Sequence, residues 1–123
     1  MRSHLSNSFI VILSALIFCI YSSAAASTIY YTEGGWGATN VYRYDTSEQN
    51  NQLLESSNTY TYIGVTVDAA SNKMYLTGRD AIHSADSSDG SGLEQLVTGS
   101  FTSEGIALDL YSGKMYLSSF AGP

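Results

Sequence analysis

The chain has 123 residues, with five Lys or Arg and eleven Asp or Glu, which give a formal net charge of −6. The acidic balance argues against a nucleic-acid-binding protein, and the 44% of hydrophobic residues argues against a disordered chain. Cys19 and Pro123 are the one cysteine and the one proline and lie toward the two ends, so the body of the chain has no disulfide and no internal proline.

Residues 1–26 have the layout of a signal peptide. Arg2 precedes an apolar run over residues 9–21, and the small residues 24–26 provide a cleavage site. The run has 13 residues, fewer than the roughly 20 that span a bilayer, so we expect no stable membrane anchor. We predict a helical leader that is removed after Ala26. The product is then a secreted chain of 97 residues with a net charge of −7.

The mature chain predicts short strands separated by turns and no helix. Apolar and polar residues alternate with the period of two that is typical of strands, and Gly, Asn, Asp and Ser mark the turns. In chain order, we expect strands over residues 29–32, 41–45, 52–54, 65–68, 74–77, 82–86, 93–97, 105–109 and 115–118. The strands over 65–68 and 74–77 are more apolar than those over 82–86 and 93–97. Because the later two strands contain more polar residues, we expect them to be more exposed to solvent.

The mature chain also repeats itself. Residues 64–78 align with residues 105–119 at a constant offset of 41, and seven of the fifteen positions are identical. A weaker copy at residues 29–32 matches residues 74–77 at an offset of 45. The three units cover approximately residues 28–60, 61–101 and 102–123. A repeat of about 40 residues that holds four antiparallel strands is typical of a β-propeller blade.

We therefore predict an all-β, partial β-propeller of four-stranded blades in residues 27–123, with about two and a quarter blades. The smallest closed propeller has four blades and needs roughly 160 residues, so blade faces at both ends should stay open. An open face would bind a protein ligand or a second copy of the chain. The other interpretation is a truncated product that has no independent function.

The unit resembles the low-density lipoprotein receptor class B repeat, also called the YWTD repeat. The resemblance rests on Gly-Val-Thr-Val-Asp from Gly64, Met-Tyr-Leu-Thr from Met74 and Asp-Gly-Ser from Asp89, and similar elements recur from Gly105 and Met115. It implies a six-bladed, usually extracellular parent propeller that binds protein ligands and has neither catalytic activity nor a cofactor. The structural motif positions are Tyr30, Thr32, Glu33, Gly64, Asp68, Tyr75, Thr77, Asp89, Gly90, Gly105, Asp109 and Tyr116.

A propeller hydrolase of the gluconolactonase-like or NHL-repeat type is the alternative. Such an enzyme would hold a divalent metal ion in its channel, and only Asp68 and Asp109, at equivalent repeat positions, are candidate ligands. Both follow an apolar strand, so we prefer a role as acceptors of backbone N–H groups in the next turn. We therefore predict no metal ligand.

Three other features suggest sites. His83 and Ser84 could indicate a hydrolase, but alternation places them on opposite faces of a strand, so we expect a solvated histidine on an outer strand. The pair Asp89-Gly90 predicts a type I′ hairpin turn. Trp36, in a glycine-rich insertion, is a possible ligand contact, although a packing role is favoured. The sequence thus predicts an exported, non-catalytic protein-binding module without a cofactor.

Overall fold

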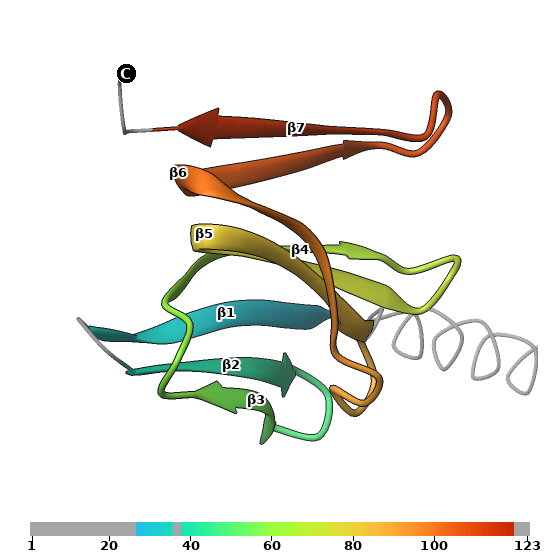
Figure 1. The fold of residues 1–123 in the computed structure, drawn as a ribbon. Coiled ribbons are helices and arrows are strands. Elements are labelled where there is room, and N and C mark those ends of the chain that lie inside the picture. Colours follow the sequence, from blue (N-terminus) through green and yellow to red (C-terminus); the bar gives the residue numbers. More distant parts are fainter. Residues whose placement is uncertain (1–26, 36–37, 120–123) are drawn as a thin grey trace, which may run out of the picture.

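The computed structural model describes residues 27–35 and 38–119, and the regular structure in this part of the chain is entirely β-strand (Figure 1). The predicted all-β fold class is therefore confirmed. The predicted leader, residues 1–26, and the possible ligand contact Trp36 lie outside the described residues. No helix that could cross a membrane occurs in the described part of the chain.

The described strands form two antiparallel sheets. One has the order β1-β2-β3, and the other, which is curled, has the order β4-β5-β6-β7. The strands are β1 (Thr28–Gly35), β2 (Ala38–Asp45), β3 (Asn50–Ser57), β4 (Tyr62–Asp68), β5 (Lys73–Asp86), β6 (Glu94–Asp109) and β7 (Lys114–Ser119). Each strand predicted from the sequence lies within one of these elements, to within one residue.

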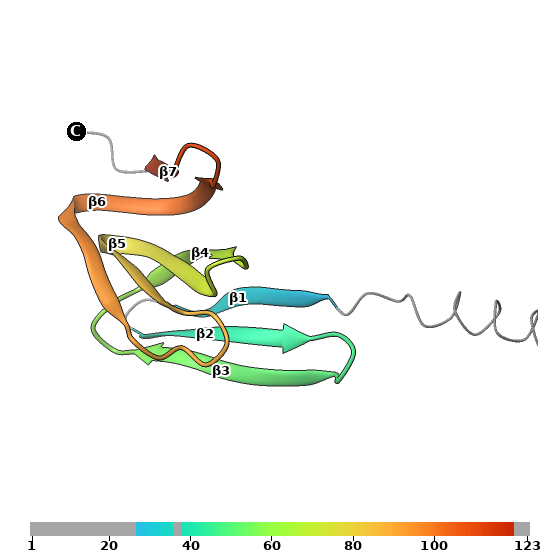
Figure 2. The ribbon, with the colours of Figure 1, turned by 90° about the vertical axis from the view of Figure 1, so that its right-hand side faces the viewer.

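Strand β5 reverses its direction near the middle. Its ends lie side by side, because the N–H of Ser87 donates to the carbonyl oxygen of Asn72 at 3.0 Å. A straight strand of 14 residues would hold its ends roughly 40 Å apart. Asp80, with a φ of 65°, lies at the reversal, and Figure 2 shows the two halves of β5 meeting there. The halves are the predicted strands over 74–77 and 82–86.

Strand β6 is shared between two layers of the structure. Residues 94–102 pair with β5, and residues 103–109 pair with β7. Because β4 pairs with the first half of β5 and residues 94–102 of β6 pair with its second half, the chain from β4 to residue 102 is an antiparallel meander. We call β1–β3 the first layer, this meander the second layer, and residues 103–109 with β7 the third layer. Figures 1 and 2 show the three layers one above another.

The hydrophobic core lies between the first and second layers. Its buried side chains are Val41 and Leu54 from the first layer and Tyr62, Met74, Leu76 and Ala85 from the second. Partly buried side chains, among them Tyr30, Val65 and Val67, pack around this cluster. Burying an aliphatic side chain fully contributes about 1.5–3 kcal/mol, so this contact is the main stabilising interface of the described fold.

The burial of one predicted strand differs from the expectation. Residues 94–100 of β6 are exposed, as predicted, but residues 81–85 of β5 are buried throughout. Ala85 belongs to the core cluster, and the ring of Tyr60 lies 4.4 Å from that of His83. The prediction that 82–86 is solvated is therefore wrong, because side chains from other segments cover this strand.

The loop at Asp89-Gly90 is wider than the predicted type I′ turn. Of the pair Asp89-Gly90, only Gly90 has a positive φ, of 77°, whereas both central residues of a type I′ turn need one; the other positive φ in this loop is that of Gly92, at 67°. The N–H of Asp86 donates to the carbonyl oxygen of Ser91 at 2.9 Å. A Cβ at Gly90 would lie 1.9 Å from the carbonyl oxygen of Leu54, so contact with β3 requires glycine at this position.

The position of the core predicts unequal effects at two equivalent leucines. Leu76 is fully buried, whereas Leu117, one repeat later, is 42% exposed. We expect Leu76→Ala to lower the free energy of unfolding by about 2–5 kcal/mol, since it leaves a cavity. The matched control, Leu117→Ala, should lower it by about 1 kcal/mol or less. Urea unfolding followed by circular dichroism measures both, and equal losses would contradict this location of the core.

Candidate functional site

One face of each layer carries a tyrosine and, two residues later, a hydroxyl residue. These pairs are Tyr30 and Thr32 in β1, Tyr75 and Thr77 in β5, and Tyr116 and Ser118 in β7. Residues two apart on a strand share a face, so each pair lies on one side of its layer. We call this side the stacking face of the layer.

The second layer covers the stacking face of the first. The hydroxyl of Thr32 donates to the carbonyl oxygen of Ile63 at 3.1 Å. The hydroxyl of Tyr30 donates to the carbonyl oxygen of Ser87, also at 3.1 Å. Both bonds join a side chain to a backbone carbonyl oxygen of the next layer. They fix the register between the two layers.

The third layer covers the stacking face of the second. Thr77 is fully buried, and its hydroxyl donates to the carbonyl oxygen of Ser103 over 3.5 Å. Gly64 lets the layers approach closely. A Cβ at this position would lie 2.7 Å from Oγ1 of Thr77 in its own layer, and in the third layer 2.9 Å from the carbonyl oxygen of Glu104 and 3.5 Å from Cγ2 of Ile106. A side chain at position 64 would therefore push the third layer away.

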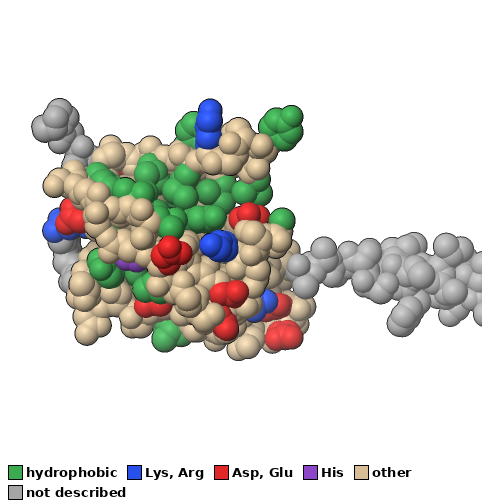
Figure 3. Space-filling view, turned by 45° about the vertical axis from the view of Figure 1, so that its right-hand side comes forward, with side chains coloured by type: hydrophobic (Ala, Val, Ile, Leu, Met, Phe, Trp, Pro, Cys, Tyr) green, Lys and Arg blue, Asp and Glu red, His purple; other side chains and the backbone are tan. Residues whose placement is uncertain are grey.

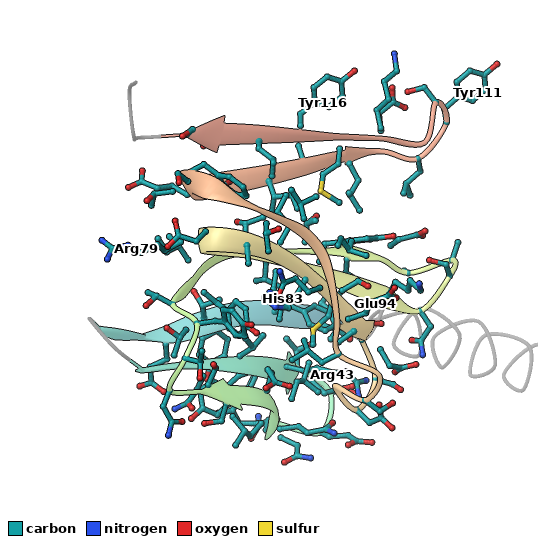
Figure 4. All side chains as sticks on the ribbon, viewed as in Figure 1. Arg43, Arg79, His83, Glu94, Tyr111 and Tyr116 are labelled. Carbon is teal, nitrogen blue, oxygen red and sulfur yellow. The ribbon has the colours of Figure 1, made fainter. Side chains whose placement is uncertain are left out.

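Nothing in the described part of the chain covers the stacking face of the third layer. A Cβ at Gly105 would meet only the side chain of Ser118, whose hydroxyl accepts the N–H of Gly105 at 2.9 Å. Tyr116 is 56% exposed, Tyr111 is fully exposed, and Ala107, opposite Tyr116 in the register, is exposed as well. Both labelled tyrosines point away from the other strands in Figure 4. In Figure 3, most of the visible hydrophobic side chains form a band across the upper middle of the molecule, below its upper edge.

A second exposed apolar surface lies on the opposite side of the first layer. Ile29 is 51%, Tyr31 36% and Leu53 51% exposed. Tyr31 stacks on Tyr42 with ring centroids 5.2 Å apart, and Leu53 pairs with Tyr42 on the other side. We call the surface formed by Ile29, Tyr31, Tyr42 and Leu53 the base face. The described molecule therefore has an open apolar face on each of its two outer layers.

The predicted aspartates hold turns. Asp68 accepts the N–H of Ala70 at 3.0 Å and the hydroxyl of Ser71 at 2.6 Å. Asp109 accepts the N–H groups of Tyr111 and Ser112, both at 3.1 Å. The hydrogen bond from the serine hydroxyl is the largest of the causes that hold the pKa of each carboxyl below its usual value.

The sequence analysis missed two aspartates with the same role. Asp45 ends β2 and accepts the N–H of Ser47 at 2.8 Å, and Asp86 ends β5 and accepts the N–H of Ser88 at 2.8 Å. In both, a hydrogen bond from the serine hydroxyl is the first cause of a lowered pKa. The signal in the sequence is an aspartate at the end of an alternating segment, followed two or three residues later by serine.

The described residues do not assemble a metal centre. Asp68 and Asp109 belong to different layers, and each uses its carboxylate oxygens within its own turn. Over residues 27–35 and 38–119, no group of three His, Cys, Asp or Glu side chains is placed to hold a metal ion. The propeller-hydrolase alternative therefore gains no support from the geometry of these residues.

His83 is buried, which corrects the prediction that it is solvated. It is 2% exposed, and its ring lies 4.4 Å from that of Tyr60 and 5.6 Å from that of Tyr62. Its Nδ1 has no hydrogen-bond partner among the described residues. Burial disfavours the charged imidazolium and so holds the pKa of His83 below its usual value. The histidine packs between tyrosines, and the described residues around it do not form a catalytic arrangement.

The remaining motif residues lie apart from the stacking faces. Glu33 is exposed and faces Asn40 in the register of β1 and β2. Asp89 accepts the N–H of Ser91 at 2.9 Å and so stabilises the loop after β5.

A polar hollow lies beside the first layer and is lined by Arg43, among other residues. A guanidinium nitrogen of Arg43 lies 3.9 Å from a carboxylate oxygen of Asp45, so the positive charge of Arg43 is already close to a negative one.

Comparison with known proteins does not assign a family. No protein-family model matches the sequence, and no curated protein matches it. The functional argument therefore rests on the arrangement of the layers and their two open faces.

Two glycines at equivalent positions test the close approach of the layers. We expect Gly64→Ala to lower the free energy of unfolding by about 1–3 kcal/mol, because the added methyl group meets the backbone of the third layer. Gly105→Ala is the matched control and should change it by less than about 1 kcal/mol, since only the Ser118 side chain must move. Urea unfolding gives both values. An equally small change in the free energy of unfolding for Gly64→Ala and Gly105→Ala would contradict the close approach of the second and third layers at Gly64.

The burial of His83 predicts a pH dependence of stability. A histidine whose folded pKa lies below 6.5 takes up its proton more readily in the unfolded state, so stability is fully present above pH 6.5 and falls on acidification. Thermal unfolding from pH 8 to pH 5 should show this decrease in the wild type. His83→Phe keeps a ring against Tyr60 and Tyr62 but cannot titrate, so its stability should decrease less than that of the wild type over this range. Parallel curves would contradict the burial of His83.

Proposed function

We propose that this chain is an exported, non-catalytic protein-binding module whose layers are of the YWTD-propeller type and whose open stacking face is the binding surface. The observation that carries the proposal is the exposed third stacking face, with Tyr111 and Tyr116 pointing outward (Figure 4). The residues that form the interface between the second and third layers recur on this face, where the described chain leaves them uncovered.

The chemistry of the face suits a protein partner. Tyrosine supplies a large, rigid contact area with a polar tip and is enriched among the residues that contribute most to binding. Gly105 and Ala107 lie beside Tyr116 and project little from the sheet, so the backbone of a partner can come close. Leu110, which is 59% exposed, extends the apolar area at one end.

Charge adds a preference among partners. The chain carries a net charge of −6, so it should favour partners with basic surfaces. This attraction acts mainly on the rate of association and is screened over about 8 Å at physiological ionic strength. The leader predicted over residues 1–26 would deliver the module outside the cell, which supports an extracellular partner.

Binding to an extracellular protein tests this function. Wild-type residues 27–123, which contain every described strand, would be immobilised and exposed to extracellular fluid from the source organism. A recovered protein would then be purified and titrated against the wild type, Tyr116→Lys and Ser100→Lys. Ser100 is exposed on β6 outside the stacking face and serves as the control.

We expect Tyr116→Lys to weaken binding by about tenfold or more, as for a central aromatic contact, and Ser100→Lys to leave it unchanged. Equal affinity for both variants would contradict the assignment of the face. Failure to recover any protein that binds the purified wild type would contradict the function itself.

A further inference from the structure

We propose that the open stacking face of one copy packs on the base face of a second copy, so that the chains join head to tail. This inference rests on the proposed function, because it names the partner of the same face. The two outer surfaces of the molecule are the two halves of an interface that the chain already forms twice between its own layers.

The upper half of that interface recurs on the third layer. Its positions in the second layer are Gly64, Thr66, Tyr75 and Thr77, and the offset of 41 places Gly105, Ala107, Tyr116 and Ser118 at the same positions in the third. The register agrees, because Thr66 pairs with Tyr75 and Ala107 pairs with Tyr116. In the second layer this face is covered by Ile106 and its neighbours. In the third layer it is exposed.

The lower half recurs on the first layer. Met74 and Leu76 of the second layer point toward the first layer and are completely buried. The offset of 45 places Ile29 and Tyr31 at their positions in β1, where 51% and 36% of each residue is exposed. The base face therefore carries apolar side chains at positions that a neighbouring layer covers when one is present.

Charge fits the same arrangement. The turns that follow β2, β4 and β6 lie on one side of the stack in Figure 1. If a second copy continues the stack in the same direction, Lys114 at the start of β7 comes near the turn of the second copy that contains Glu48. Lys114 shares its strand face with Tyr116, and both Lys114 and Glu48 are exposed in a single copy.

The two faces are different surfaces, so the contact between copies is heterologous. Such a contact closes into a ring if its rotation allows and otherwise continues as a chain of copies. A face-to-face dimer that uses the same surface twice is the competing arrangement, and blocking one face at a time distinguishes the two.

Sedimentation velocity of residues 27–123 tests the proposal with two variants. The upper variant carries Ala107→Lys and Tyr116→Lys, and the base variant carries Ile29→Lys and Leu53→Lys. All four residues are exposed in a single copy, so each variant should keep the circular dichroism spectrum of the wild type. We expect the wild type to form oligomers, each variant alone to be a monomer, and an equal mixture of the two to form a dimer, because each variant retains the face that the other lacks.

Several results would overturn the head-to-tail arrangement. They are a wild type that stays monomeric up to its solubility limit, a base variant that still forms dimers, and a mixture of variants that stays monomeric. A charge exchange provides a second readout. Lys114→Glu should weaken wild-type self-association, and adding Glu48→Lys in the same chain should restore it.

The outcomes also separate this inference from the proposed function. A monomeric wild type whose Tyr116→Lys variant loses an extracellular protein partner leaves the binding function in place and removes self-association. If the wild type forms oligomers, the upper variant does not, and no external partner is recovered, then self-association stays in place and the proposed binding of an external partner is removed.

Discussion

The close contact between layers at Gly64 is the constraint on which the rest of the structure depends. There a Cβ on β4 would lie 2.9 Å from the carbonyl oxygen of Glu104 in the third layer, so an added side chain would force the two layers to shift. The hydroxyls of Thr32 and Thr77 each donate to a carbonyl oxygen of the next layer. A glycine and a short hydroxyl residue together allow neighbouring layers to pack at close range, with the hydroxyl group donating to a carbonyl oxygen of the next layer.

Because these features are encoded in a repeat, they appear wherever the repeat does, including on the third layer, where the described residues provide no further layer. The third layer carries Gly105 and Ser118 in the same positions as Gly64 and Thr77, and Ser118 turns its oxygen to the N–H of Gly105 instead. The exposed aromatic side chains at the two ends of the described stack are therefore residues of a packing interface that are left in solvent. Exposed apolar surface of this kind is typical of an interaction site.

Much of the fold follows from local pattern, and the exceptions arise from contacts between distant segments. Alternation located the strands, and the motif spacing located the tyrosines and hydroxyls that meet the next layer. The burial of His83 could not be predicted in this way, because Tyr60, from the connection between β3 and β4, and Tyr62, at the start of β4, pack against it. The loop at Gly90 depends on the carbonyl oxygen of Leu54, which lies more than thirty residues earlier in the chain. The proposed function of the third stacking face likewise depends on which stacking faces are covered by another layer. No single segment of the sequence encodes this arrangement.

The most direct test of this account is a nuclear Overhauser measurement on residues 27–123. The account predicts a strong cross-peak between the α protons of Gly64 and the γ-methyl group of Ile106, since a Cβ at Gly64 would lie 3.5 Å from that methyl carbon. Gly105 should show no such contact with a methyl group of the same copy outside its neighbours in the sequence. The absence of the Gly64–Ile106 cross-peak in a folded sample would contradict the stacking of the second and third layers.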